Sequence, residues 1–201
     1  MKKLIPPWVR SAMIVTVVAI ICMGCPNPPP PFCSTTGTNF QNLYTTTLLS
    51  NPNYTNKVTM DLLTHEYTFT VSTIKFLCRI GYRGNAYMQA NSLPYTMEVY
   101  NNTTSTMVFS GSNIFNSTAI SYMSAFGTLS PGNSYTVRRT IPPAGYGPNI
   151  GNTIGRICVF SPGPVPYPVS FGVLTISASK FYGMGGPINN FGIPYIDLVF
   201  W

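Results

Sequence analysis

Short runs of β-forming residues, each ended by a turn, divide the sequence between Lys57 and Trp201. No segment shows a sustained apolar period of 3.6 residues, so no long helix is expected. The runs predict about nine strands: Tyr67–Ser72, Ile74–Tyr82, Tyr95–Tyr100, Thr106–Ser110, Ser121–Phe126, Ser134–Thr140, Arg156–Phe160, Ser170–Ser179 and Ile193–Trp201. Many short strands with Pro and Gly turns favour an all-β fold, an antiparallel, jelly-roll-like β-sandwich over residues 57–201.

One run shows the alternation of a half-buried strand clearly. Between Tyr95 and Tyr100, apolar side chains alternate with Thr96 and Glu98. Successive side chains of a strand point to opposite faces of the sheet. We therefore expect Thr96, Glu98 and Tyr100 to share one face, with the apolar residues on the other.

The N-terminus has the layout of an export signal. A positively charged head of Lys2, Lys3 and Arg10 precedes an apolar run from Ala12 to Met23, too short for a comfortable membrane span. We expect residues 1–24 to be a signal peptide. The rest of the chain would then reach the cell envelope, outside the cytoplasm.

The junction Gly24-Cys25 resembles the processing site of bacterial lipoproteins, although Cys22 stands where that family prefers Leu. The resemblance implies that Cys25 carries a lipid and anchors the protein to a membrane, in the periplasm or at the outer membrane or cell surface. The alternatives are ordinary cleavage near Gly24 and an uncleaved anchor. The proline-rich residues 26–31 predict an extended spacer, within a tether and irregular segment over residues 25–56.

The chain from about Thr59 to Trp201 resembles an uncharacterised β-sandwich domain of secreted and surface bacterial proteins, often found beside carbohydrate-active or adhesive modules. The stretches that carry the likeness are Tyr67–Val71 with Ile80–Tyr82, Tyr95–Tyr100, Leu129–Val137, and Leu174–Ser179 with Phe181-Tyr182 and Ile193–Asp197. These are strand and turn signatures without a catalytic motif. The resemblance implies a sandwich outside the cytoplasm whose role is recognition rather than chemistry.

The composition excludes two classes of protein. Hydrophobic residues make up 45% of the chain, which argues against disorder. The net charge of +7 includes the three cations of the signal, and the others are scattered apart from Arg138-Arg139. Nucleic-acid binding needs a basic stripe, so nucleic acid is not an expected partner.

Three cysteines remain after the signal and Cys25, namely Cys33, Cys78 and Cys158. Cys78 and Cys158 both lie in predicted strands, so we predict that these two pair in an oxidising compartment. The alternative is that all three are small buried or free thiols. None of the cysteines has the spacing of a metal site.

Catalytic groups are few. The chain has four acidic residues and one histidine, and only Asp61, His65 and Glu66 cluster. A polar surface is the expected use of that cluster. The sequence has no G-x-S-x-G turn to hold a serine nucleophile. We therefore expect no enzyme, no metal and no cofactor.

Binding is the more natural use of the loop residues. Aromatic rings stack on the apolar faces of sugars, and the candidate ligand contacts in or beside loops are Tyr87, Tyr146, Tyr167 and Tyr182. Arg139 is the candidate for an anionic group. The alternative for each tyrosine is ordinary packing with a wet hydroxyl, and for Arg139 a simple surface charge.

Two functions are therefore open at the level of sequence. The first is a binding module for glycan or another surface ligand. Aromatic loops clustered at one end of the sandwich would favour it. The second is a structural or assembly subunit of the envelope or of an appendage. A long exposed edge strand or a large apolar patch would favour the second.

Overall fold

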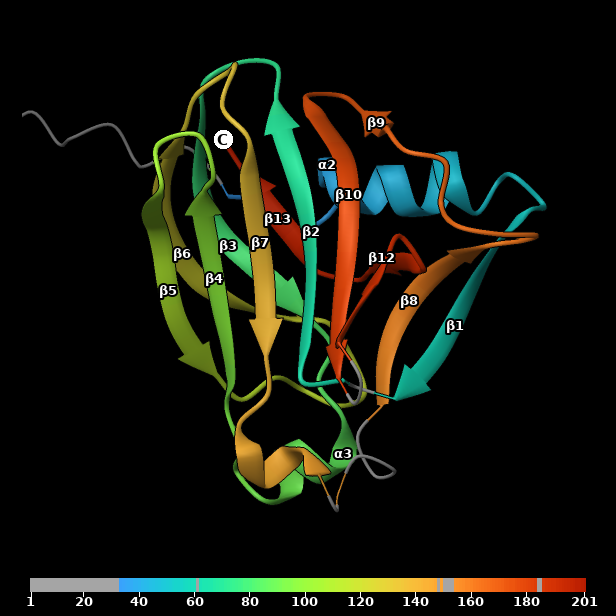
Figure 1. Cartoon of the computed structure of the whole chain (residues 1–201). Helices are drawn as coiled ribbons and strands as arrows, with labels where there is room; N and C mark the ends of the chain where they lie inside the picture. The colour runs from blue at the N-terminus through green and yellow to red at the C-terminus, as the bar shows by residue number, and fades with distance from the viewer. Residues whose placement is uncertain (1–32, 61, 148, 150–153, 184–185) are drawn as a thin grey trace, which may run out of the picture. The chain divides into compact units, whose positions relative to one another are not determined.

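Thirteen strands, all paired antiparallel, build the part of the chain that the structure describes (Figure 1). This computed structural model describes residues 33–60, 62–147, 149, 154–183 and 186–201. The predicted signal peptide, Cys25 and the proline-rich spacer lie outside the described residues. The strands are β1 (Tyr54–Met60), β2 (Thr64–Val71), β3 (Lys75–Tyr82), β4 (Tyr95–Asn101), β5 (Thr106–Asn113), β6 (Ser121–Leu129), β7 (Tyr135–Thr140), β8 (Ile154–Phe160), β9 (Val169–Phe171), β10 (Leu174–Gly183), β11 (Gly186–Asn189), β12 (Gly192–Pro194) and β13 (Asp197–Phe200).

The prediction of an all-β antiparallel sandwich is confirmed, with thirteen strands rather than nine. Two predicted runs are each broken into two strands. In one of them Gly172, at a φ of +57°, makes the turn between β9 and β10. The strands β1 and β11 were not predicted, because their residues are mostly polar or are Gly and Pro, which lack the β-forming signal.

The strands form two layers. The large sheet has the order β11-β10-β2-β7-β4-β5, with β9 also paired to β10. A small sheet, β13-β3-β6, lies behind it in Figure 1. A third sheet, β1-β8-β12, lies beside the small sheet, towards the right of the view.

The core lies between the large and small sheets. Strands such as β4 and β7 contribute alternate residues to it, which is the pattern expected of a sandwich. The fully or almost fully buried members include Tyr67, Phe69, Met97, Val99 and Val137 from the large sheet and Leu77, Ile80, Ala125 and Leu198 from the small one.

The segment before β1 corrects the prediction of an irregular segment over residues 33–56. It forms the short helix α2 (Asn39–Asn42) and the π-helical turn η1 (Leu43–Leu48). Four apolar side chains of this segment are buried in the same core: Phe40, Leu43, Tyr44 and Leu48. Their spacing of i, i+3, i+4 and i+8 is that of one helix face. The compact unit therefore begins at Cys33 rather than at Lys57.

The disulfide also differs from the prediction. Cys78 pairs with Cys33, at a Cα–Cα separation of 6.3 Å, and Cys158 is a buried free thiol. Cys78 lies on β3 and Cys158 on β8, two strands that belong to different sheets. The predicted Cys78–Cys158 pairing is therefore wrong, because both cysteines being in strands says nothing about which strands are neighbours.

Candidate ligand site on the large sheet

The outer face of the large sheet carries a row of alternating charges across four strands. Lys180 on β10 is paired with Glu66 on β2, Glu66 with Arg138 on β7, and Arg138 with Glu98 on β4. Alternation along each strand sends the intervening residues into the core, so all four charged side chains stand on one face.

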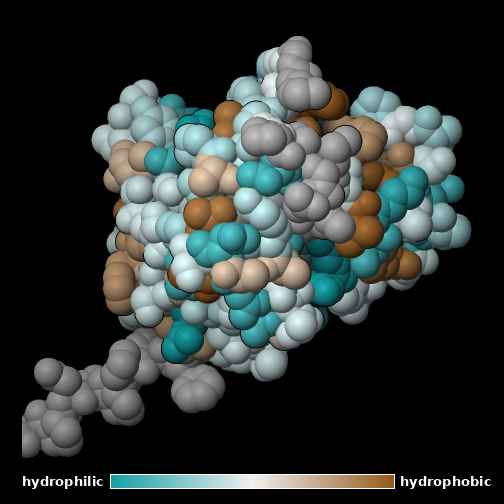
Figure 2. All heavy atoms as spheres, turned by 90° about the horizontal axis from the view of Figure 1, so that it is seen from below, coloured by the Kyte–Doolittle hydropathy of each residue, from teal (hydrophilic) through white to brown (hydrophobic). Residues whose placement is uncertain are grey.

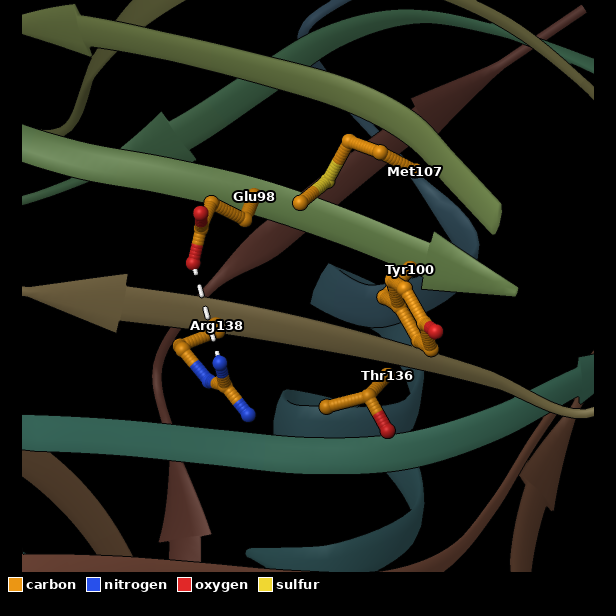
Figure 3. A pocket seen from close by; sticks show the side chains of 5 residues that line it. All are labelled: Glu98, Tyr100, Met107, Thr136 and Arg138. Carbon is orange, nitrogen blue, oxygen red and sulfur yellow. Dashed lines mark ion pairs between the residues drawn. The ribbon is translucent and has the colours of Figure 1, made fainter. Parts of the chain in front are cut away.

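Arg138 holds the row together. Its Nε donates to Glu66 Oε2 at 2.7 Å. Its Nη1 lies 3.8 Å from Glu98 Oε2, the ion pair that is dashed in Figure 3. Partial burial acts to lower the pKa of the Arg138 guanidinium, but the hydrogen bond to Glu66 and the charges of both carboxylates raise it overall. The hydroxyl of Tyr182 adds a bond to Glu66 Oε1 at 3.3 Å. The side chains are thus fixed before any ligand arrives.

A hollow of about 240 Å³ opens beside this row. It is lined by Glu98, Tyr100, Met107, Thr136 and Arg138. Figure 3 shows Glu98 and Tyr100 on β4 between Met107 on β5 and the two residues from β7. The hollow therefore offers an aromatic ring and a thioether at one end and charged groups at the other.

Register explains why these side chains meet. Tyr100 is paired with Met107 on one side and with Thr136 on the other. The β4–β5 register shifts between Val99 and Tyr100, which brings Met107 opposite the tyrosine. Tyr100 is 36% exposed, so its ring is available to a ligand.

Hydroxyl pairs continue the polar face on both sides of the charged row. Thr68 and Thr136 approach to 3.5 Å between their Oγ1 atoms, and Thr96 Oγ1 lies 3.3 Å from Ser112 Oγ. Each hydroxyl can both donate and accept a hydrogen bond. Such a surface can exchange its internal bonds for bonds to a ligand that is itself rich in hydroxyls.

The predicted tyrosines are not brought together. Tyr87 lies on the short helix α3 (Ala86–Ala90), and Tyr146 directly follows the 3-10 turn η2 (Pro143–Gly145). Both pack partly against the core. The lower end of the molecule, where α3 lies, carries hydrophobic residues only in separate small patches on its coloured surface (Figure 2).

The other two predicted tyrosines lie on other elements, Tyr167 in the loop before β9 and Tyr182 in β10. Tyr167 is half-buried, its hydroxyl donates to the Gly192 carbonyl at 3.4 Å, and burial raises its pKa. Tyr182 stands at the end of β10 and bonds Glu66, so of the four it alone touches the charged row. The position of Tyr167 is that of a packing residue, which was the alternative to ligand contact.

Arg139 is not available to a ligand, which corrects the prediction. It is 0% exposed, its Nη1 donates to the Leu62 carbonyl at 2.8 Å, and its guanidinium lies over the rings of Tyr82 and Tyr95. Neighbours in a strand point to opposite faces, and it is Arg138 that takes the outer one.

Of the predicted cluster, His65 and Glu66 are 0% and 6% exposed, so they do not form the expected polar surface. Burial, and then the charge of Arg139, lower the pKa of His65 well below its usual value, so its ring stays neutral. Within the described residues, no three His, Cys, Asp or Glu side chains gather as metal ligands. Asp61, the third member of the predicted cluster, lies outside the described residues.

None of the five residues that line the hollow was among the predicted site residues. The alternation of β4 does place Glu98 and Tyr100 on one polar face, so the sequence alone could have grouped these two lining residues. Their neighbours on β5 and β7 depend on strand order, which alternation does not encode.

Comparison of the chain with protein-family models and with curated proteins gives no match. Among the described helices, none has the length and apolar character needed to cross a membrane.

Proposed function

We propose that this protein is an exported, membrane-anchored binding module without catalytic activity, and that its ligand is a glycan held on the outer face of the large sheet. The observation that supports this most is the hollow lined by Tyr100, Met107, Thr136, Glu98 and Arg138. The export signal and the Gly24-Cys25 junction in the sequence support the location.

The lining suits a sugar ring. Tyr100 and Met107 present an apolar surface on which the C–H face of a sugar can lie, and Thr136 stands beside them. Carboxylate, guanidinium and hydroxyl groups at the edge can bond ring hydroxyls. Binding sites commonly combine an apolar lining with a few placed polar groups in this way.

The same geometry favours binding over hydrolysis. Glycosidases need two carboxyl groups with separate tasks, one of them kept protonated. Here Glu66 and Glu98 both lie against one guanidinium, that of Arg138, so the two carboxylates share one partner instead of having separate tasks.

A glycan-binding screen of the purified protein, repeated with Tyr100→Ala, tests the proposal. We expect the variant to bind the glycan about tenfold more weakly, since an aromatic anchor at the centre of a site contributes on the order of 1.4 kcal/mol or more. Phe171→Ala is the matched control, because Phe171 on β9 has the same exposed fraction of 36%. Unchanged binding by Tyr100→Ala would overturn the assignment of the site.

A second candidate function, an assembly subunit, is favoured by β1. In the described part of the chain this strand pairs only with β8, and its residues from Thr55 to Val58 are exposed. A groove of about 430 Å³ runs beside it, with Lys57, Phe160 and Phe191 among its lining. An unpaired strand edge is a template for another strand.

Light scattering of the purified protein distinguishes this second function. An assembly subunit that pairs through β1 forms oligomers whose mass falls to that of one chain in Val58→Pro, because proline removes a backbone donor from the edge. A monomeric parent protein excludes self-assembly through β1.

A further inference from the structure

We propose that the outer face of the small sheet, β13-β3-β6, is a lipid-docking surface that rests on an anionic bilayer through Phe76, Phe126 and Trp201, with Arg79 beside them. This inference rests on the anchoring part of the proposed function. It adds which face of the domain meets the membrane, and with what chemistry.

Three large aromatic side chains are exposed on this sheet. Phe126 is 75% exposed, Trp201 44% and Phe76 40%. The rings of Phe76 and Trp201 stack with their centroids 4.6 Å apart, and their backbones exchange two hydrogen bonds of 3.1 Å. Aromatic rings with this exposure are costly in water and are favoured at the boundary of a bilayer.

Strand pairing puts these residues on one face. Phe76 is paired with Thr128 and Arg79 with Ser124, and Phe126 lies between those two partners on β6. The buried residues Leu77, Ile80 and Ala125 are their strand neighbours and point into the core. The exposed aromatic rings and Arg79 therefore point outward together.

The charge of this face suits anionic lipid. Arg79 is exposed, and of the described acidic side chains only that of Asp197 belongs to this sheet. Glu66 and Glu98 are on the opposite sheet, and Asp197 is buried beneath Thr38 and Gln41. A cation near an anionic bilayer surface adds attraction, and the one acid whose register places it on this face, Asp197, is covered and does not meet the lipid.

The attachment of the N-terminal segment favours a lipid bilayer as the partner of this face. The Cys33–Cys78 disulfide fixes the start of the domain to β3, next to Arg79. Seven residues separate Cys25 from Cys33, so the eight steps of a proline-rich spacer, at about 3.1 Å each, reach only about 25 Å. A lipid on Cys25 would hold this face within that distance of the bilayer and leave the large sheet turned away.

Trp201 supplies an internal probe, because the chain has two tryptophans and the other, Trp8, is replaced in a Trp8→Phe variant. This variant, expressed in a host that processes lipoproteins and purified from its membranes, is reconstituted in vesicles of phosphatidylcholine, with or without phosphatidylglycerol, whose acyl chains carry bromine. We expect Trp201 emission to shift to the blue and to be quenched, more strongly with phosphatidylglycerol.

Two further substitutions sharpen the test. Arg79→Ser should lower the ratio of docked to undocked domain about fivefold in anionic vesicles, as expected for one cation at the surface. Phe126→Ser should also reduce the quenching. Ile188→Ser on β11 is the matched control, since Ile188 is 51% exposed on the large sheet, and it should leave the quenching unchanged.

Flotation of the same vesicles separates the outcomes. Protein that floats while Trp201 keeps a water-exposed emission overturns docking and leaves the anchor standing. Protein that does not float overturns both. A blue shift of Trp201 emission that increases with the amount of protein per vesicle, without quenching by brominated lipid, would mean that a second copy covers the face. That result also overturns lipid docking.

Discussion

At the scale of single residues, Asp197 shows how one buried acid fixes the N-terminal segment. Its carboxylate accepts hydrogen bonds from Thr38 Oγ1 at 2.6 Å, and from Gln41 Nε2 and Tyr122 Oη at 2.8 Å each. Burial raises the pKa of Asp197, although these three hydrogen bonds act to lower it. The acid is thus well bonded yet costly to ionise.

This residue gives a pH prediction. An acid whose pKa is raised by folding contributes stability below its unfolded pKa, about 3.9, and loses that contribution as the pH rises through the folded pKa. The free energy of unfolding of the parent protein should therefore fall relative to that of Asp197→Asn as the pH rises above about 4. Urea unfolding from pH 4 to pH 7 measures both; parallel profiles would contradict the prediction.

At the scale of elements, the segment Asn39–Leu48 is helical although its sequence predicted an irregular segment. Its Thr- and Asn-rich exposed face resembles a loop, and only four of its ten residues are buried. Tertiary burial of that one face stabilises it, since a helix this short is marginal by itself.

The burial of this segment can be tested by truncating one side chain. Leu43 is fully buried in the core, so Leu43→Ala should lower the free energy of unfolding by about 2–5 kcal/mol. Leu49→Ala, at the partly buried residue that follows η1, is the matched control and should cost less. A neutral Leu43→Ala, measured by urea unfolding, would mean that residues 33–56 are a tether after all.

At the scale of the whole molecule, the disulfide connects the N-terminal segment to the small sheet over a sequence separation of 45 residues. Closing a loop of this length restricts the unfolded chain and stabilises the fold by about 2–4 kcal/mol. Cys33→Ser should lower the free energy of unfolding by this amount and remove its response to reductant.

Cys158 supplies the control for that experiment. Burial raises the pKa of its thiol to about 12, so it should resist alkylation in the folded protein and react once the protein is unfolded. Cys158→Ala should keep the response to reductant. If Cys158→Ala lost the response to reductant and Cys33→Ser kept it, the disulfide would join Cys78 to Cys158 instead of to Cys33.

The two proposed surfaces lie on opposite layers of the sandwich. The hollow beside Arg138 opens on the large sheet, and the aromatic face around Phe126 belongs to the small sheet behind it (Figure 1). A domain that rests on lipid through one layer would present the other to ligands in solution. The two proposals are thus compatible, while their tests use different residues.

The sequence by itself determined the all-β class and most of the strands, although not β1 and β11, because alternation is a local property that survives in a strand of a sandwich. Only the tertiary structure decided that Arg138 stands between Glu66 and Glu98, that Cys33 meets Cys78, and that Arg139 is enclosed. These contacts join residues many positions apart, and strand order and register, set by the packing of the whole core, choose them.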